Sequence, residues 1–145
     1  MKEIHRKKGD DCPYYLHDTF INQIICKKKN VKFVFDKGYF VKGNEDCIPV
    51  QGNIEFQNVD YYFCCVYVLD IDIESGKISG RQYPLKKFVK KYPELKLEIT
   101  DETYYYNKSR FSGIMHRKWK KKNRKKVREF IIELYHSGDM VYITE

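Results

Sequence analysis

Apolar residues occupy every second position through residues 61–73, the longest such run in the chain. The odd positions carry only Tyr, Phe, Cys, Leu and Ile, and the even positions begin apolar and end in two aspartates. A period of two places alternate side chains on opposite faces of a β-strand. The run therefore predicts a central strand with a bend or bulge, because thirteen extended residues exceed a small sheet. Its core face is expected to carry Phe63, Cys65, Tyr67 and Leu69.

Shorter runs with the same period predict further antiparallel strands. Residues 20–26, 31–35 and 39–41 are separated by short polar turns, which predicts a three-stranded meander. Residues 1–13 are polar and predicted to be irregular, and residues 101–107 are predicted to be a turn. The remaining strands are expected at residues 50–56, 78–83, 95–99, 111–119 and 140–144.

One segment has helical spacing. Leu85, Phe88, Val89 and Tyr92 lie at i, i+3, i+4 and i+7, with lysines between them and a proline on either side. This predicts a short amphipathic helix on the sheet. The fold class is therefore α+β, mostly antiparallel β, with a curved or barrel-like sheet and one short helix packed on it. No linker or repeat divides the chain, so residues 1–145 are expected to form a single domain.

Residues 127–136 fit two structures. Val127, Phe130, Ile131 and Leu134 match a helical face, and the same segment also alternates as a strand. The β-branched and aromatic residues favour the strand. The polar residues 136–139 then predict a hairpin turn into the strand at 140–144.

The ends and the cysteines bear on location. No apolar stretch of signal-peptide or membrane-helix length occurs, so we expect a cytoplasmic protein with no membrane partner. Five cysteines with irregular spacing and no C-x-x-C predict free thiols in a reducing compartment rather than disulfides or a zinc site.

The basic charge is local. Nine of the twelve residues 117–128 are Arg or Lys, whereas the first 116 residues hold 19 bases and 16 acids. The stretch could bind nucleic acid, with Trp119 stacking on a base, or it could be a solvated turn rich in lysine through codon bias. The candidate nucleic-acid or anion contacts are Arg117, Lys118, Trp119, Lys120, Lys121, Lys122, Arg124, Lys125 and Lys126.

Three consecutive tyrosines, Tyr104, Tyr105 and Tyr106, form a candidate interaction surface, since Tyr is enriched at protein interfaces. Consecutive strand residues cannot all face one way, so at least one is expected to pack into the core. An interface and ordinary edge-strand packing remain equal alternatives.

Other polar residues offer weaker candidates. His17 and Asp18 resemble a catalytic pair with Cys12 upstream, but neighbours in a strand point apart. His116 and His136 could meet if the last strands pair, with Asp139 joining them in a metal site. The aspartates of the 61–73 run, Asp70 and Asp72, could bind a cation or mark where that strand leaves the core.

The segments Tyr15-Leu16-His17-Asp18-Thr19-Phe20-Ile21, Phe35-Asp36-Lys37-Gly38-Tyr39 and Gly52 to Phe56 carry a family resemblance. They resemble small uncharacterised bacterial β-rich proteins that open with a Leu-His-Asp strand. Some of those proteins are suspected to neutralise toxins. The resemblance implies an immunity-type role and transfers no catalytic residues.

No glycine-rich phosphate loop, nucleophile elbow or H-E-x-x-H motif occurs, so the sequence predicts no cofactor, no metal site and no common enzyme class. We therefore expect a non-catalytic cytoplasmic binding domain whose partner is another protein. The alternative is a nucleic-acid-binding module that uses residues 117–128.

Overall fold

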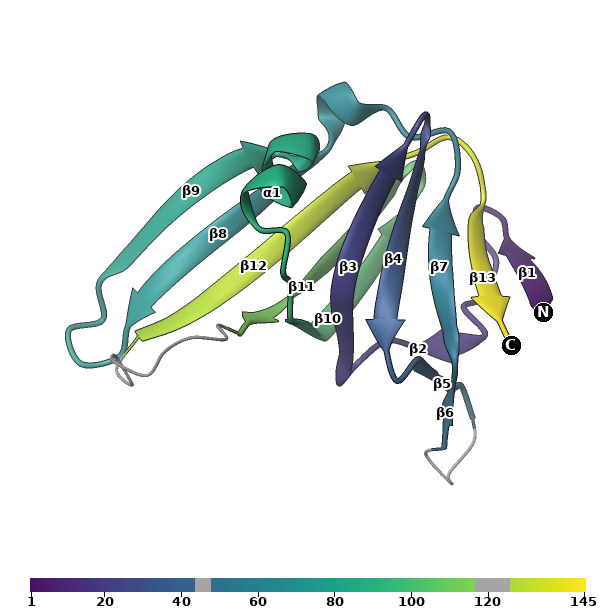
Figure 1. Ribbon diagram of the computed structural model, residues 1–145, viewed down its shortest axis with the longest axis horizontal. Helices are drawn as coiled ribbons and strands as arrows, with labels where there is room; N and C mark the ends of the chain where they lie inside the picture. Colours follow the sequence, from purple (N-terminus) through teal and green to yellow (C-terminus); the bar gives the residue numbers. More distant parts are fainter. Residues whose placement is uncertain (44–47, 117–125) are drawn as a thin grey trace.

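Ten strands form one antiparallel sheet in the computed structural model, which describes residues 1–43, 48–116 and 126–145. Their order is β1-β13-β7-β4-β3-β10-β11-β12-β8-β9, and a second small sheet has the order β2-β5-β6 (Figure 1). The predicted mostly antiparallel fold is confirmed, and the sheet is open because β1 and β9 lie at its two edges. The strands are β1 (Lys2–Arg6), β2 (Tyr14–Tyr15), β3 (Thr19–Lys27), β4 (Asn30–Asp36), β5 (Tyr39–Val41), β6 (Pro49–Val50), β7 (Gly52–Phe56), β8 (Cys65–Asp72), β9 (Ile78–Pro84), β10 (Leu97–Tyr105), β11 (Lys108–Met115), β12 (Lys126–Tyr135) and β13 (Met140–Thr144).

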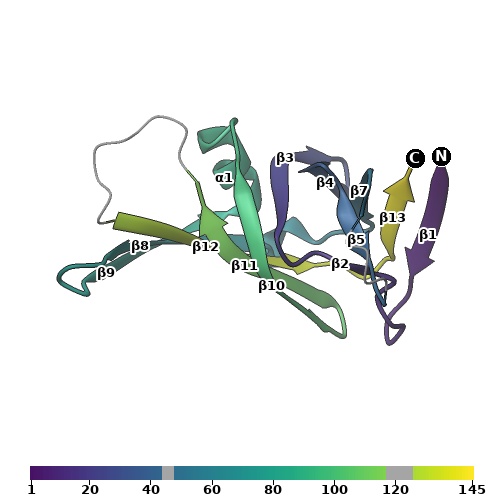
Figure 2. The same cartoon turned by 90° about the horizontal axis from the view of Figure 1, so that it is seen from below.

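The sheet curls around its one α-helix, α1 (Leu85–Lys91). The helix contacts both β3 and β8, although these strands are four places apart in the sheet. Figures 1 and 2 show α1 on the inner side of this curve. Leu85 and Phe88 are fully buried beneath it, so the amphipathic helix predicted from their spacing is confirmed.

A bulge in β10 contributes to the curve. The pairing of β10 with β11 shifts between Ile99 and Asp101. At this point Gly113 of β11 lies so close to β10 that a Cβ would be 1.8 Å from the carbonyl oxygen of Glu98. Only glycine fits where the two backbones approach so closely.

The register predicted for residues 61–73 is wrong. Residues Tyr61–Phe63 form a short 3-10 helix, η1, and β8 begins at Cys65. Val66 is fully buried and Val68 nearly so, whereas Phe63 is 57% exposed. Cys65, Tyr67 and Leu69 are partly exposed on the opposite face. Both faces of β8 are apolar at its start, so the period of two could not decide which one meets the core. The strand is also next to the edge of the sheet and not central.

Two further strands differ from expectation near the N-terminus. Residues predicted to be irregular form β1, which pairs with β13 at the edge, where a polar strand is tolerated. The third strand of the expected meander, β5, does not join β4. It pairs with β2 and β6 in the small sheet, where the Tyr39 ring lies 4.8 Å from that of Tyr14 and closes one end of the core.

The C-terminal half also differs in its pairing. The predicted turn at 101–107 is mostly strand, because β10 continues to Tyr105. Residues 127–136 belong almost entirely to β12, which settles the ambiguity in favour of a strand. The expected hairpin between this strand and β13 is wrong: β12 pairs with β11 and β8, and β13 pairs with β1 and β7. Turn residues predict a change of direction, but they do not decide the next pairing partner.

Candidate functional site: a hollow lined by tyrosines and bases

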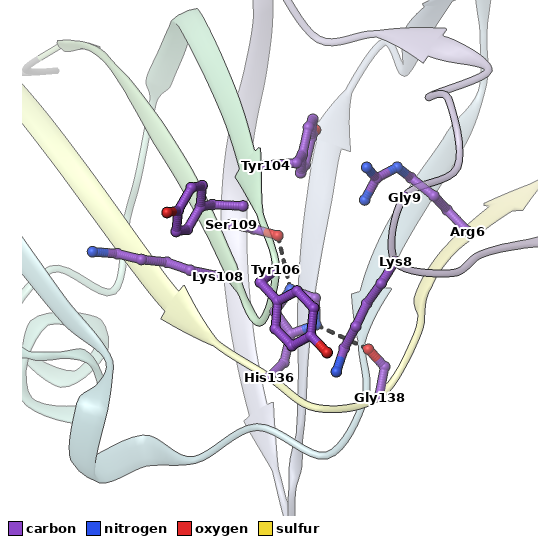
Figure 3. A pocket seen from close by; sticks show the side chains of 10 residues that line it. Arg6, Lys8, Gly9, Tyr104, Tyr106, Lys108, Ser109, His136 and Gly138 are labelled. Atoms are coloured by element: carbon purple, nitrogen blue, oxygen red, sulfur yellow. Dashed lines mark hydrogen bonds between the residues drawn. The ribbon is translucent and has the colours of Figure 1, made fainter.

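A hollow of about 360 Å³ lies where three segments meet. The segments are the loop after β1, the β10–β11 hairpin and the connection between β12 and β13 (Figure 3). Sequence positions more than 100 residues apart therefore line one surface. We call it the tyrosine hollow; its walls are formed by Arg6, Lys8, Tyr104, Tyr105, Tyr106, Lys108, Ser109 and His136.

The three predicted tyrosines divide between the interior and the surface. Tyr104 packs against the core, and its hydroxyl donates to Glu102 Oε1 at 2.8 Å. Tyr105 and Tyr106 are 75% and 79% exposed. The expectation that at least one of the three packs into the core is confirmed. The other two rings leave an exposed aromatic surface at the tip of the hairpin.

Basic side chains stand beside these rings. The Arg6 guanidinium carbon lies 4.5 Å from the centre of the Tyr104 ring, and Lys8 Nζ lies 4.8 Å from that of Tyr106. Such cation–π contacts hold flexible side chains in place. Arg6 Nε also donates to the carbonyl oxygen of Asp10 at 3.0 Å. Lys108 differs from them, because it forms an ion pair with Glu133.

The floor of the hollow is a hydrogen-bonded pair that sequence reasoning missed. His136 Nδ1 lies 3.1 Å from the carbonyl oxygen of Gly138, so this nitrogen donates. In the neutral ring, Nε2 then accepts from the Ser109 hydroxyl at 2.7 Å. Burial lowers the pKa of His136, and the charges of Arg6 and Lys8 lower it further. No local sequence pattern could have predicted this contact, because Ser109 and His136 are 27 positions apart.

The Ser109–His136 pair joins two segments at the base of the hollow. Ser109 is only 2% exposed, so its hydroxyl is enclosed by the structure. The pair ties β11 to the segment that follows β12. This bond therefore fixes the base of the hairpin that presents Tyr105 and Tyr106.

The charge of the tyrosine hollow has one sign. Of the described residues that line it, three are Lys or Arg, and none is Asp or Glu. The nearby carboxylate of Glu102 accepts from Tyr104 and from the Leu16 backbone amide at 2.7 Å. The arrangement favours a ligand that carries negative charge.

The predicted basic stretch contributes little to the described structure. Arg117, Lys118, Trp119, Lys120, Lys121, Lys122, Arg124 and Lys125 lie outside the described residues. Lys126 is the exposed first residue of β12. Arg128 is engaged by Asp70: the distances are 2.6 Å from Nε to Oδ1 and 3.3 Å from Nη2 to Oδ2. Asp72 accepts backbone hydrogen bonds from Glu74 and Ser75 and so stabilises the turn after β8.

The histidines of the predicted metal site are not brought together. The expected meeting of His116 and His136 is wrong: His116 Nε2 contacts Glu98 Oε1 at 2.9 Å, while His136 contacts Ser109. Asp139 lies 3.1 Å from His5 Nδ1 instead. In residues 1–43, 48–116 and 126–145, no group of three or more His, Cys, Asp or Glu side chains could hold a metal ion.

The pair His17–Asp18 does form, against the expectation that neighbours point apart. His17 Nδ1 lies 3.1 Å from Asp18 Oδ2 because Asp18 adopts a positive φ of 65° in a turn. Cys12 and His17 both line a second hollow of about 330 Å³. Burial raises the pKa of the Cys12 thiol, which disfavours the thiolate that a nucleophile needs.

Comparison with protein-family models, curated proteins and solved structures finds no significant match to this chain. Within the described part of the chain, none of the helices has the length and apolar character needed to cross a membrane. The four cysteines in that part, Cys12, Cys26, Cys64 and Cys65, are all free thiols.

Proposed function

We propose that this protein is a non-catalytic binding domain that recognises an acidic segment of another protein through the tyrosine hollow. One observation carries the proposal: two tyrosines that are at least 75% exposed stand beside three bases in a hollow whose described lining has no carboxylate. Tyrosine and arginine are the residues that most often dominate binding energy at protein interfaces. In the tyrosine hollow, the exposed tyrosines can supply aromatic contacts to a partner, and the neighbouring bases can supply charged ones.

Preorganisation supports the same function. The contacts of Lys8 with Tyr106 and of Arg6 with Tyr104 restrict both basic side chains before a partner arrives. Binding then costs less side-chain entropy than it would for free lysines. The Ser109–His136 hydrogen bond holds the hairpin from below. The hollow is therefore suited to bind without a large rearrangement.

Cytoplasmic location and an immunity-type role are narrower forms of this proposal. The resemblance of the N-terminal segments to suspected toxin-neutralising proteins favours the immunity role. Such a protein acts by covering a surface of its target, and complementary shape and charge are sufficient for that.

Site-specific photocrosslinking tests the proposal. A benzophenone amino acid replaces Tyr106 in one variant and Tyr62 in its control, which is 88% exposed but lies on η1. Irradiation in extract of the cells that make the protein should give a discrete protein adduct from position 106 alone. Lys8→Glu in the same variant should abolish it, because like charges then face each other.

Two results would contradict the proposal. One is an identical set of adducts from positions 62 and 106, and the other is an adduct that Lys8→Glu leaves unchanged. With an identified partner, the double variant Tyr105→Ala/Tyr106→Ala should raise Kd by about tenfold or more. An adduct removed by nuclease treatment would favour the second candidate.

That second candidate is nucleic-acid binding. Exposed aromatic rings beside lysines also suit stacking on bases and contact with phosphates. Lys8 Nζ lies 4.8 Å from the centre of the exposed Tyr106 ring, and Tyr105 beside it is also exposed, which supports this candidate. The acidic protein partner is preferred because the described lining holds its three bases in one compact hollow, and Lys108 is already paired with Glu133. Single strands bind in a basic groove that follows their backbone. The role of residues 117–128 stays a prediction.

A further inference from the structure

The strand β1 forms the open edge of the large sheet beside the tyrosine hollow. Figures 1 and 2 show it as the outermost strand at this end, and among the described strands it pairs with β13 alone. Its last residue, Arg6, lines the hollow. A turn then ends the edge: the Lys7 amide donates to Asp10 Oδ2 at 3.2 Å, and the Lys7 carbonyl accepts from the Asp10 amide at 3.0 Å. The edge therefore leads directly into the tyrosine hollow.

The pairing of β13 with β7 shows how the backbone of β13 is turned. The Gln57 amide donates to the carbonyl of Asp139 at 3.0 Å, and the Glu145 amide donates to the carbonyl of Gln51 at 3.1 Å. The register between these two bonds is unbroken. Successive residues of a strand point their backbone groups to alternate sides. The odd-numbered residues of β13 therefore face β7, and its even-numbered residues face β1.

The backbone of β1 follows from this alternation. The even-numbered residues of β13 lie opposite Lys2, Ile4 and Arg6, so the amide and carbonyl groups of these three residues face β13. Those of Glu3 and His5 point the other way, along the open edge, where no described strand pairs with them. Unpaired amide and carbonyl groups at a sheet edge are a template for one more strand.

One side of this edge is basic and apolar. The side chains of Lys2, Ile4 and Arg6 share the core side of the sheet, where Ile4 packs against the core and Arg6 lies over the Tyr104 ring. The carboxylate of Glu102, which contacts Tyr104, already accepts two hydrogen bonds within the chain. A strand added here would therefore meet a row of base, isoleucine and base.

The acids of this edge are on its other side. Glu3 Oε2 lies 3.5 Å from His5 Nε2, and Asp139 Oδ2 lies 3.1 Å from His5 Nδ1. Both carboxylates are thus held by one imidazole, away from the basic row.

The charge pattern argues against a second copy of this chain as the added strand. The antiparallel pairing that puts Ile4 of two copies together also puts Lys2 of each copy opposite Arg6 of the other. The other edge strand, β9, carries Arg81 and no acid. Like charges directly opposite one another destabilise a strand pair. A segment with an acid, an apolar residue and an acid at alternate positions complements the row instead.

We propose that an extended acidic segment of the partner protein adds to β1 as one further strand and continues into the tyrosine hollow. This inference rests on the proposed function and specifies the conformation and pattern of the acidic segment. Its apolar side chain lies opposite Ile4, its acids lie opposite Lys2 and Arg6, and the chain beyond Arg6 reaches Lys8. Backbone hydrogen bonds to Glu3 and His5 supply affinity, and the alternate side chains supply specificity.

N-methylated peptides test the strand pairing without altering the protein. The probe is the capped, fluorescein-labelled peptide Asp-Thr-Asp-Thr-Val-Thr-Asp-Thr-Asp, which is symmetric and fits β1 in either direction. Fluorescence anisotropy measures its Kd. Methylation of the two Thr amides that flank Val, which face Glu3 and His5, should raise Kd at least about tenfold. Methylation of the Val amide, which points away from β1, should change Kd by less than about threefold. Replacing every Asp by Lys should also raise Kd at least about tenfold.

Proline variants place the same test in the protein. Glu3→Pro removes an outward amide N–H and no bond to β13, a position where an edge strand tolerates proline. It should raise the Kd of the unmodified peptide at least about tenfold. Its controls are Glu3→Gln, which keeps the N–H, and Gln82→Pro, in the exposed edge strand β9. Both controls should bind like the wild type.

Two results overturn the strand addition. One is no binding of the unmodified peptide at ~1 mM, and the other is equal binding of the peptides methylated at Val and at the flanking Thr residues. The proposed function fails separately from this inference. If Lys8→Glu weakens peptide binding and amide methylation does not, the tyrosine hollow binds acidic segments without strand pairing.

Discussion

Two neighbouring isoleucines of β12 test which face of the sheet is the core. Ile132 is fully buried on the side of α1, and Ile131 is partly exposed on the opposite face of the sheet. The same substitution, Ile→Ala, therefore probes both faces at adjacent positions. The period of two in residues 61–73 predicted a core on the face of Tyr67, and Tyr67 pairs with Ile131.

The expected loss of stability at each position follows from how deeply the isoleucine is buried. Ile→Ala removes three carbon atoms, and each is worth about 0.8 kcal/mol when it is fully withdrawn from water. The loss of about 2.4 kcal/mol at Ile132 is increased by the cavity that remains, which gives about 2–5 kcal/mol in all. Ile131 is already partly solvated and leaves no enclosed cavity, so Ile131→Ala should cost about 1 kcal/mol or less.

Urea unfolding, followed by circular dichroism, measures both free energies. The m-value should stay unchanged, since neither variant alters the surface exposed on unfolding by much. An equal cost at the two positions, or a larger cost at Ile131, would refute the assignment of the core face.

Two further changes probe the sheet and the hollow. Gly113→Ala should destabilise the fold by at least about 2 kcal/mol, measured by the same unfolding assay, because its Cβ would overlap the Glu98 carbonyl; a neutral effect would mean that the bulge in β10 relaxes freely. Burial lowers the pKa of His136 below its ordinary value of 6.5. As pH falls below 6.5, the unfolded chain therefore binds more protons than the folded protein. The free energy of unfolding is highest above pH 6.5 and decreases as pH falls through the pKa of the folded state. The slope should be at most about 1.4 kcal/mol per pH unit, and His136→Gln should flatten it; an unchanged slope in that variant would show that other groups carry the dependence.

Local pattern determined the secondary structure of most of the chain. The alternation at 31–35 predicted β4, in which Val31, Phe33 and Phe35 are buried. The other face carries the charged Lys32, so the strand has one preferred way to meet the core. The spacing that begins at Leu85 predicted α1 for the same reason. In both elements, the residues of the element alone determine which side faces the core.

Tertiary structure decided those features for which the local sequence pattern allowed more than one answer. In β8 both faces are apolar at the start, so only the packing of α1 and β12 shows that Val66, and not Tyr67, lies in the core. The three consecutive tyrosines were visible in the sequence as a candidate surface. Their basic neighbours Arg6 and Lys8 were not visible, because they belong to the edge strand β1 and the loop that follows it, about 100 residues away in the sequence. Contacts between residues distant in sequence depend on which strands pair, and a two-residue period carries no information about pairing.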